Sequence, residues 1–515
     1  MCKKVLWKGF FVCLCVLLLG SLASAAITPD ALDYDVVIIG GGGSGSCAAL
    51  AAAQAGVKVL VIEKGRKLGG SSQFTKGMMG INTSLQKARN MRLTPKTIFK
   101  RMENYTHLLF NARLAKATVD NSADTIEWLL DNGVKLWLPG RPQQYAHDVQ
   151  EPIIYHMWDG QQGMAALQAA IEKAGADILL KAEARKIHTH ADGSMRGVRA
   201  VTDQGVVYDI RAKAVIVATG GYIGNNKMME ANGIVGHPMG WLPSDGVGLK
   251  IAYEAGATRF KEEITQYHGT GIVTADNRES VLFPKLEPLI HIPILWVDPT
   301  GQRYYNEDHV YDNAFVSHAL VSIGGQGLVV FDQAFVDTCM KGKIGLTDSF
   351  AQIRGIKGGE SGPLPTLQAD LEAGIKEGIV YKGKTLEVLA DQAGFLKEEF
   401  LGQVKQYNGY VKAKADKQFY KSAKSLRYPV RKAPFYALKV VTYNLSTMGG
   451  IKVNEKLEAV TPDFKAIKGL YAAGNVASGL YSDSYMTIEG LTMGFATISG
   501  RLAGQNSAAF VKSLR

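Results

Sequence analysis

Cysteine is scarce in this chain of 515 residues, and three of its five cysteines fall within the predicted signal segment described below. Only Cys47 and Cys339 follow, too few for a framework of disulfide bonds. A Cys-x-x-Cys-His sequence is also missing, which excludes a c-type haem bound by the chain itself. The basic residues are scattered rather than clustered. We therefore expect neither a nucleic-acid partner nor a bound metal ion.

The first 25 residues differ from the rest of the chain. Three lysines precede an apolar run at 10–19, and Ala23-Ser24-Ala25 supplies the small side chains of a signal-peptidase site. The run is short for a hydrocarbon core of ~30 Å. We predict a cleaved secretory signal at 1–25, with an uncleaved anchor as the alternative. The mature protein is then exported, periplasmic if the host has two membranes, and not stably inserted in a membrane.

A dinucleotide-binding unit follows. An apolar, β-branched run that starts at Asp35 is typical of a buried parallel strand, and Gly40, Gly42 and Gly45 follow it as G-x-G-x-x-G. An Ala-rich helix comes next, and a second strand ends in Glu63, placed to accept hydrogen bonds from a ribose hydroxyl. The glycines let the backbone approach a pyrophosphate at the N-terminus of the helix. The pattern predicts an α/β fold of the Rossmann type.

Four further motifs are spread over almost the whole chain. They are Gly-Gly-Ser-Ser at 69–72 with the loop to 79, Ala-Thr-Gly-Gly at 218–221, Ser-Asp-Gly at 244–246, and the glycine-rich segments 469–474 and 500–504. In this order they resemble the FAD-dependent oxidoreductase 2 superfamily, which includes the flavoproteins of fumarate reductase and succinate dehydrogenase. The resemblance implies FAD rather than NAD. It also implies a discontinuous FAD-binding domain, 26–264 plus 446–515, with an inserted α+β substrate-capping domain at 265–445.

The same resemblance implies a set of cofactor contacts. Carried over position by position, they are Gly40, Gly42, Ser44, Gly45, Glu63, Gly70, Ser71, Ser72, Gly77, Met78, Asp245 and Asn475. Asn475 stands where the family usually has Glu, so it departs from the pattern.

The arginines with which fumarate reductases bind a dicarboxylate are missing. A guanidinium matches a carboxylate in a bidentate fork, but Tyr311 stands at the position of one such arginine and Thr487 at the other. Ser446 replaces a substrate-binding histidine, and no arginine occurs from Lys432 to Gly500. We therefore expect fumarate and succinate to be poor substrates.

Asn306-Glu307 followed by Tyr311-Asp312 instead resembles 3-oxosteroid dehydrogenases. That resemblance implies that Tyr311 exchanges a proton with the carbon beside a carbonyl, that Tyr485 is a second active-site tyrosine, and that the backbone of Gly490 polarises the carbonyl. The loop that contains Tyr485 is one residue longer than in the steroid enzymes. His268 resembles the substrate-contacting histidine of fumarate reductases. A packed core tyrosine and a structural histidine are the alternatives for Tyr311 and His268.

These features predict an FAD-dependent oxidoreductase acting on CH–CH groups. In the reductive direction, flavin N5 delivers a hydride to an enone or enoate and a tyrosine donates the proton. A tyrosine of ordinary pKa, near 10, is a better acid than base, which favours reduction. Nicotinamide is not expected outside the cytoplasm, so we expect a separate c-type cytochrome or FMN-bearing electron donor. The alternatives are a 3-oxosteroid-type dehydrogenase working oxidatively and a non-catalytic flavin electron carrier.

Overall fold

The computed structural model describes residues 32–140, 153–342, 363–481, 486 and 488–515, together with the backbone of 344–345 and 360–361. The predicted signal at 1–25, Tyr485 and Thr487 lie outside the described residues. Buried apolar side chains form three clusters. The first draws on residues 34–264 and 448–511, with Ala314, and we call this part of the molecule the Rossmann half. The other two draw on residues 272–440, and we call that part the cap.

An eight-stranded sheet forms the centre of the Rossmann half, with strand order β19-β20-β8-β1-β2-β5 and with β7 and β6 continuing from β8. The strands are β1 (Asp33–Ile39), β2 (Val59–Ile62), β5 (Asp177–Leu179), β6 (Ala182–Thr189), β7 (Met195–Thr202), β8 (Val207–Val217), β19 (Glu458–Val460) and β20 (Ala466–Ala472). The five strands from β20 to β5 are parallel. Helices cover β1 and β2, and all four residues of β2 are buried, as is typical of parallel strands.

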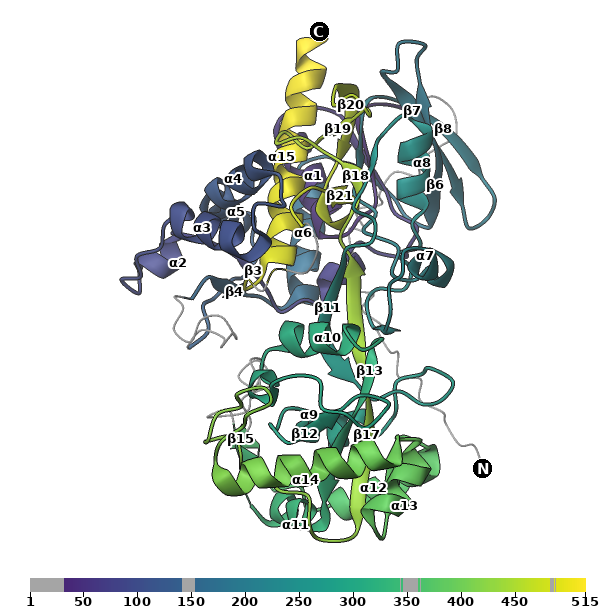
Figure 1. Ribbon diagram of the computed structural model, residues 1–515. Coiled ribbons are helices and arrows are strands. Elements are labelled where there is room, and N and C mark those ends of the chain that lie inside the picture. The colour runs from purple at the N-terminus through teal and green to yellow at the C-terminus, as the bar shows by residue number, and fades with distance from the viewer. Residues whose placement is uncertain are drawn as a thin grey trace, which may run out of the picture.

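Small residues allow two helices of the Rossmann half to cross closely. α1 (Gly43–Gln54) packs against α15 (Leu491–Ser513) and α6 (Gly160–Lys173). A Cβ atom added at Gly500 would lie 2.2 Å from the Ser44 carbonyl oxygen, and one at Gly504 would lie 2.3 Å from that of Ala48. The two glycines therefore set the distance between α15 and the start of α1. Figure 1 shows α15 passing through this half to the C-terminus.

The other elements of the Rossmann half surround this core. They are β3 (Gly77–Met79), β4 (Tyr155–Met157), β9 (His237–Pro238), β10 (Arg259–Phe260), β18 (Gly450–Lys452), β21 (Ala477–Ser478), α2 (Ser84–Lys87), α3 (Pro95–Thr106), α4 (Ala112–Asp120), α5 (Ser122–Asp131), α7 (Asn226–Ala231), α8 (Val247–Glu254) and the 3-10 helices η1 (Gly70–Phe74) and η4 (Gly474–Val476). Within the described ranges, no helix combines the length and the apolar character needed to cross a bilayer.

A second sheet forms the cap, with strand order β11-β17-β13-β12 and with β16 and β9 also paired to β17. The strands are β11 (Thr265–Gly271), β12 (Leu295–Val297), β13 (Gln326–Asp332), β16 (Val380–Gly383) and β17 (Phe435–Thr447). Alternate residues of β13 face opposite sides, so Val329 and Phe331 join one buried cluster and Leu328 and Val330 the other. β17, with 13 residues, runs from the cap into the Rossmann half (Figure 1).

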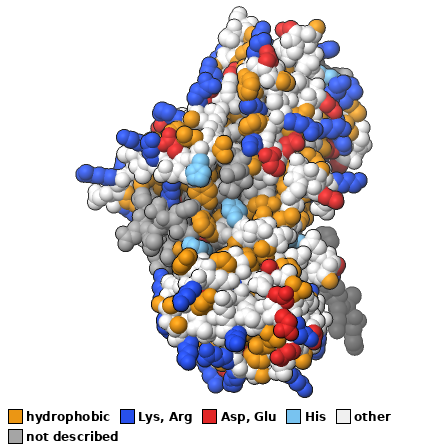
Figure 2. Space-filling model, viewed as in Figure 1, with side chains coloured by type: hydrophobic (Ala, Val, Ile, Leu, Met, Phe, Trp, Pro, Cys, Tyr) orange, Lys and Arg blue, Asp and Glu red, His pale blue; other side chains and the backbone are white. Residues whose placement is uncertain are grey.

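Helices cover both faces of the cap sheet. They are α9 (Phe283–Ile290), η2 (Glu307–His309), α10 (Asn313–Val321), α11 (Gln333–Lys341), α12 (Leu367–Glu377), α13 (Leu386–Ala393) and α14 (Lys397–Ala413), and the short strands β14 (Ile344–Gly345) and β15 (Glu360–Ser361) pair with each other. Figure 2 shows Lys and Arg side chains spread over both halves with Asp and Glu among them.

Candidate active site

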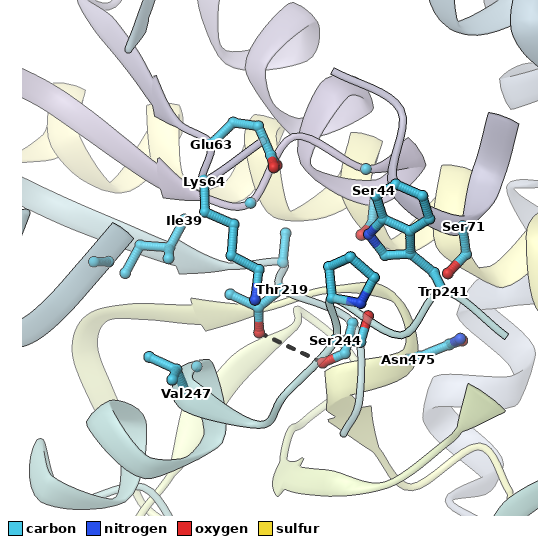
Figure 3. Close-up of a pocket in the computed structure, with 18 of the residues that line it drawn as sticks. Ile39, Ser44, Glu63, Lys64, Ser71, Thr219, Trp241, Ser244, Val247 and Asn475 are labelled. Atoms are coloured by element: carbon cyan, nitrogen blue, oxygen red, sulfur yellow. Dashed lines mark hydrogen bonds between the residues drawn. The ribbon is translucent and has the colours of Figure 1, made fainter. Parts of the chain in front are cut away.

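A cavity opens where β1 ends and α1 begins (Figure 3), and we call it the glycine-loop cavity. Its lining includes Gly40, Gly42, Ser44, Glu63, Gly70, Ser71, Ser72, Asp245 and Asn475. These are nine of the twelve predicted cofactor contacts. In Figure 3, Glu63 and Lys64 lie on one side of the cavity, and Ser71, Trp241 and Asn475 on the other.

The three glycines of the loop have different physical reasons for lacking a side chain. Gly40 has a φ of +100°, in the left-handed region that favours glycine. A Cβ at Gly45 would lie 1.8 Å from the carbonyl oxygen of Gly40, so Gly45 is required for packing and does not line the cavity. A Cβ at Gly42 would meet no atom within 4 Å and would project into open space at the cavity wall. Gly42 has no side chain with which to cap α1. Ser72 Oγ accepts a hydrogen bond from the N–H of Gly43 at 3.1 Å, and the other N–H groups of the first helical turn are left for a ligand.

Three acidic residues line the cavity, Glu63, Glu183 and Asp245, and contacts hold two of them in place. The carboxylate of Glu63 accepts hydrogen bonds from the backbone N–H groups of Gly41, at 2.7 Å, and Gly65, at 2.6 Å, which hold it at the end of β2. Asp245 forms an ion pair with Lys64 across 2.8 Å. Burial by itself would raise the pKa of the Asp245 carboxyl, but hydrogen bonds from Lys64 and from the N–H of Val247 bring it below its ordinary value.

Asn475 contacts another residue at which the chain departs from the family pattern. Its Nδ2 donates to Ser446 Oγ at 2.7 Å, and Ser446 Oγ donates to the carbonyl oxygen of Thr447 at 3.1 Å. Asn475 Oδ1 is buried and has no hydrogen-bond partner within the described part of the chain. A buried amide oxygen without a donor is costly, so this atom is suited to accept a hydrogen bond from a ligand.

A second cavity, of about 670 Å³, lies between the Rossmann half and β11, and we call it the β11 cavity. His268 and Gln266 of β11 line it, as do Gly77 and Gly490. Six residues line both cavities: Ser71, Ser72, Trp241, Pro243, Asn475 and Ala496. The two spaces are therefore neighbours, and a ligand held at the glycine loop can extend into the β11 cavity.

Gly490 lies at the wall of the β11 cavity, immediately before α15. Its φ is +68°, and a Cβ would lie 2.5 Å from the backbone of Met78. Its carbonyl oxygen accepts a hydrogen bond from the N–H of Met79 at 3.0 Å. The Met78 side chain is fully buried and lines neither cavity, so it packs in the core behind the backbone that contacts Gly490.

Tyr311 lies between η2 and α10, half-buried, and is not among the described residues that line the β11 cavity. Burial raises the pKa of the Tyr311 hydroxyl, and the nearby Asp312 and Asp308 raise it further. α10, which begins two residues later, is tied to β11 by a hydrogen bond from Ser317 Oγ to the carbonyl oxygen of Gly269 at 2.5 Å. The structure thus ties the helix that follows Tyr311 to the strand that carries His268.

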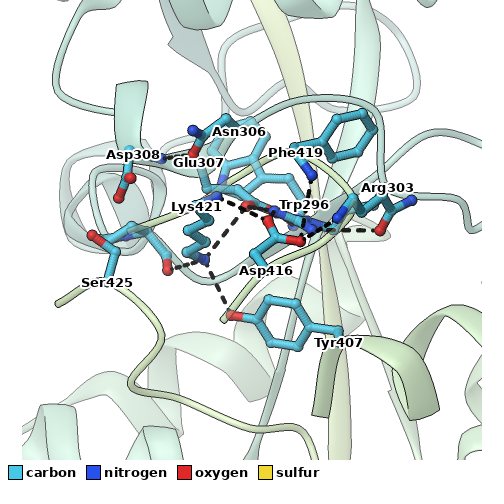
Figure 4. A network of polar contacts seen from close by, with 12 residues as sticks. Trp296, Arg303, Asn306, Glu307, Asp308, Tyr407, Asp416, Phe419, Lys421 and Ser425 are labelled. Carbon is cyan, nitrogen blue, oxygen red and sulfur yellow. Dashed lines mark hydrogen bonds and ion pairs between the residues drawn. The ribbon is translucent and has the colours of Figure 1, made fainter. Parts of the chain in front are cut away.

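A buried network of charges holds the segment that leads to Tyr311 (Figure 4). Arg303 forms a bidentate pair with Glu307, at 2.8 and 2.7 Å, and a further bond to Asp416 at 2.8 Å. Lys421 Nζ lies 3.4 Å from Glu307, and all four of these side chains are fully buried. Two positive and two negative charges balance, which offsets much of the cost of burying them.

Sequence reasoning missed several lining residues. Lys64 directly follows Glu63, and this adjacency was a usable signal that it lies near the cofactor. Trp241 belongs to the segment 239–243, which has no sequence motif, and its position beside both cavities follows only from the fold.

The residues present fit FAD. The loop offers helix N–H groups and an open wall at Gly42 for a pyrophosphate, Glu63 stands at the end of β2 for a ribose, and Asn475 Oδ1 offers a buried acceptor at the boundary of the two cavities.

Known proteins resemble the chain over nearly its whole length. A family model described as an FAD binding domain matches residues 35–486. Vinyl phenol reductase of Lactiplantibacillus plantarum is 31% identical over 498 residues, which is 93% of this chain and 97% of that protein. The open conformation of a flavocytochrome c3 fumarate reductase is 25% identical with a TM-score of 0.68, covering 93% of this chain and 79% of that one.

A steroid enzyme shares the fold at lower identity. The 3-ketosteroid delta1-dehydrogenase of Sterolibacterium denitrificans has a TM-score of 0.73 at 19% identity, covering 93% of this chain and 100% of that one. The predicted fold class and the predicted FAD cofactor are confirmed.

Proposed function

Because the chain belongs to the family with this FAD binding domain, and is an FAD-dependent oxidoreductase acting on CH–CH groups, we propose that it reduces an activated C=C bond of an enone, enoate or similarly conjugated alkene. The observation that carries the proposal is the β11 cavity, which adjoins the glycine-loop cavity and is large enough for a small organic substrate. The 31% identity to a vinyl phenol reductase over 93% of the chain supports the reductive direction.

FAD, when bound, supplies the hydride that is added to one carbon of the double bond. His268, on the wall of the β11 cavity, serves to hydrogen-bond the activating group of the substrate, and the backbone of Gly490, which lines the same cavity, serves to polarise that group. Tyr311, which lies outside the described lining of that cavity, is the proposed proton donor to the other carbon, on the strength of its position in the sequence pattern. Its hydroxyl is protonated at neutral pH, as a general acid requires, and the burial that raises its pKa makes it a still poorer base. We also retain Tyr485, which lies outside the described residues, as the proposed second tyrosine of the active site.

We further propose that a separate redox protein, a c-type cytochrome or an FMN-bearing protein, reduces the flavin, and that the chain works outside the cytoplasm. The sequence contains no Cys-x-x-Cys-His for a haem of its own, and the first 25 residues have the composition of a secretory signal.

The test is anaerobic reoxidation of the reduced holoenzyme. The flavin is reduced with dithionite and mixed with a panel of enones, enoates, vinylarenes and fumarate, and the return of visible absorbance is timed. We expect rapid reoxidation by at least one conjugated alkene and slow reoxidation by fumarate. If no alkene reoxidises the flavin while a saturated ketone reduces the oxidised form, the oxidative alternative replaces this proposal. Reaction with electron acceptors alone would favour a flavin carrier.

A further inference from the structure

The β11 cavity has a single formally charged side chain in its described lining. That side chain is Lys76, which directly precedes Gly77 in the loop after η1. Lys76 is exposed, and no ion pair joins it to an acidic residue among those the structure describes. The remaining lining consists of apolar, hydroxyl, amide and backbone groups together with His268. Among the described residues, Lys76 is therefore an exposed lysine without an acidic partner in the lining of a cavity whose other described residues carry no formal charge.

The walls near Lys76 are aromatic and apolar. The rings of Phe74 and Trp241 lie 5.7 Å apart between centroids, and the ring of Tyr155 packs against Gly77. Phe74 is 58% exposed, Met239 47% and Leu242 54%. Large apolar side chains that remain exposed together at a cavity mark a surface that an apolar ligand covers.

We propose that Lys76 pairs with an anionic substituent of the substrate, and that the substrate is an aryl-conjugated alkene that carries one such group. This inference rests on the proposed function and names its substrate class. The aromatic walls suit a planar apolar ring, and one ammonium suits one carboxylate or phenolate rather than the two carboxylates of a dicarboxylate. An ion pair at the edge of a cavity with apolar walls is screened less than a pair on open surface.

The test compares an acid with its amide, which has nearly the same shape and no charge. Phenylpropanoate and phenylpropanamide are titrated into the oxidised holoenzyme, and binding is followed through the visible spectrum of the flavin. The same measurement is made on Lys76→Met, Lys76→Arg and the control Lys67→Met. Lys67 is also exposed and lines neither cavity. Turnover of cinnamate and cinnamamide by the reduced enzyme is measured in parallel.

We expect the unaltered enzyme to bind the acid more tightly than the amide, and Lys76→Met to lose about tenfold in affinity for the acid with little change for the amide. Lys76→Arg and Lys67→Met should keep the preference, and salt should weaken binding of the acid. Equal losses for acid and amide, loss of FAD from Lys76→Met, or no binding of the acid to the unaltered enzyme would overturn the inference. Binding is read without turnover, so a failure to reduce any alkene counts against the proposed function alone.

Discussion

Asn475 donates a hydrogen bond from Nδ2 to Ser446 Oγ across 2.7 Å, although each residue replaces a different ionisable side chain of the family pattern. A glutamate and a histidine at these positions would form a charged or proton-sharing pair, whereas an amide and a hydroxyl form a neutral one. The two replacements together therefore exchange an ionisable pair for a neutral one. The pair leaves Asn475 Oδ1 turned to other partners at the boundary of both cavities.

Replacing Asn475 by Ala should weaken FAD binding. The change removes the buried acceptor and the donor to Ser446, and we expect about a tenfold loss of FAD affinity, with a loss of about 1 kcal/mol in the free energy of unfolding of the apoprotein. FAD retained after ultrafiltration measures the first effect and thermal melting the second. Ser446→Ala removes only the internal partner and should lose less FAD. Equal retention by Asn475→Ala and the unaltered protein would show that Oδ1 does not contact the cofactor.

Two glycines of the loop should respond in opposite ways to the same substitution. Gly42→Ala places a methyl group in open space and should leave the apoprotein folded but unable to hold FAD, because the methyl group occupies the path of the pyrophosphate. Gly45→Ala places it 1.8 Å from a carbonyl oxygen and should lower the melting temperature itself. Circular dichroism of the apoproteins and absorbance after FAD addition separate the two. A stable, FAD-free Gly45→Ala protein would contradict the packing role.

Tyr311→Phe removes one hydroxyl and tests the proton donor. Loss of a general acid costs about 100- to 10,000-fold in rate, whereas loss of a packing hydroxyl costs about 1 kcal/mol in stability and little rate. We expect a stable, yellow variant whose flavin is still reduced by dithionite but reoxidised very slowly by the best alkene. Tyr267→Phe is the control, because among the described residues that hydroxyl makes one long hydrogen bond, accepted from the N–H of Val235 at 3.3 Å. Normal turnover in Tyr311→Phe would pass the role to His268 or Tyr485.

His156 should make the protein less stable in mild acid. Burial lowers the pKa of its imidazole to about 4, against the opposing effects of the Ile154 carbonyl and Glu127. The ring is hydrogen-bonded to Thr83 Oγ1 at 2.8 Å and to the carbonyl oxygen of Ile154 at 3.2 Å. Since this pKa is lower in the folded state than in the unfolded state, the unfolded chain binds more protons between about pH 4 and 6.5, and stability falls as the pH falls through that window.

The total effect of His156 is about 3 kcal/mol. Urea unfolding midpoints at a series of pH values should therefore fall less steeply for His156→Gln than for the unaltered protein, whose carboxylates contribute the remaining slope. Parallel pH profiles for the two proteins would show that His156 is not the group responsible.

The local parts of the fold and site could be predicted from sequence. The strand that starts at Asp33, the glycine loop and Glu63 are neighbours along the chain, so their spacing alone defines the geometry of a nucleotide site. Contacts between distant segments could not be predicted. Lys64 and Asp245 form an ion pair although they are 181 positions apart in the sequence, and no sequence motif near either residue indicates the pairing. The FAD cofactor and fold class are confirmed, whereas the domain boundaries and the roles of the individual site residues stay predictions.

The face that a strand residue presents is harder to predict from sequence than the position of a loop glycine. Met78 was expected among the FAD contacts because it follows Gly77 in the motif. Successive side chains of a strand point to opposite faces, and the Met78 side chain faces the core instead of either cavity. Tyr311 fits the steroid-enzyme pattern in sequence, but its distance from the substrate depends on how α10 and the charge network are placed, which a linear pattern does not encode.

The pairing of Thr265 in β11 with Thr447 in β17 has a consequence for how this architecture can diversify. The chain enters the cap and leaves it through positions about 5 Å apart. The whole cap is therefore a segment inserted between two paired threonines. Exchange of that inserted segment leaves the spacing between the glycine loop, Glu63 and α15 unchanged. Because the inserted segment carries His268, Tyr311 and Ser446, which the proposed function places near the substrate, exchange at these two points would change the proposed substrate contacts and leave the FAD-binding loop as it is.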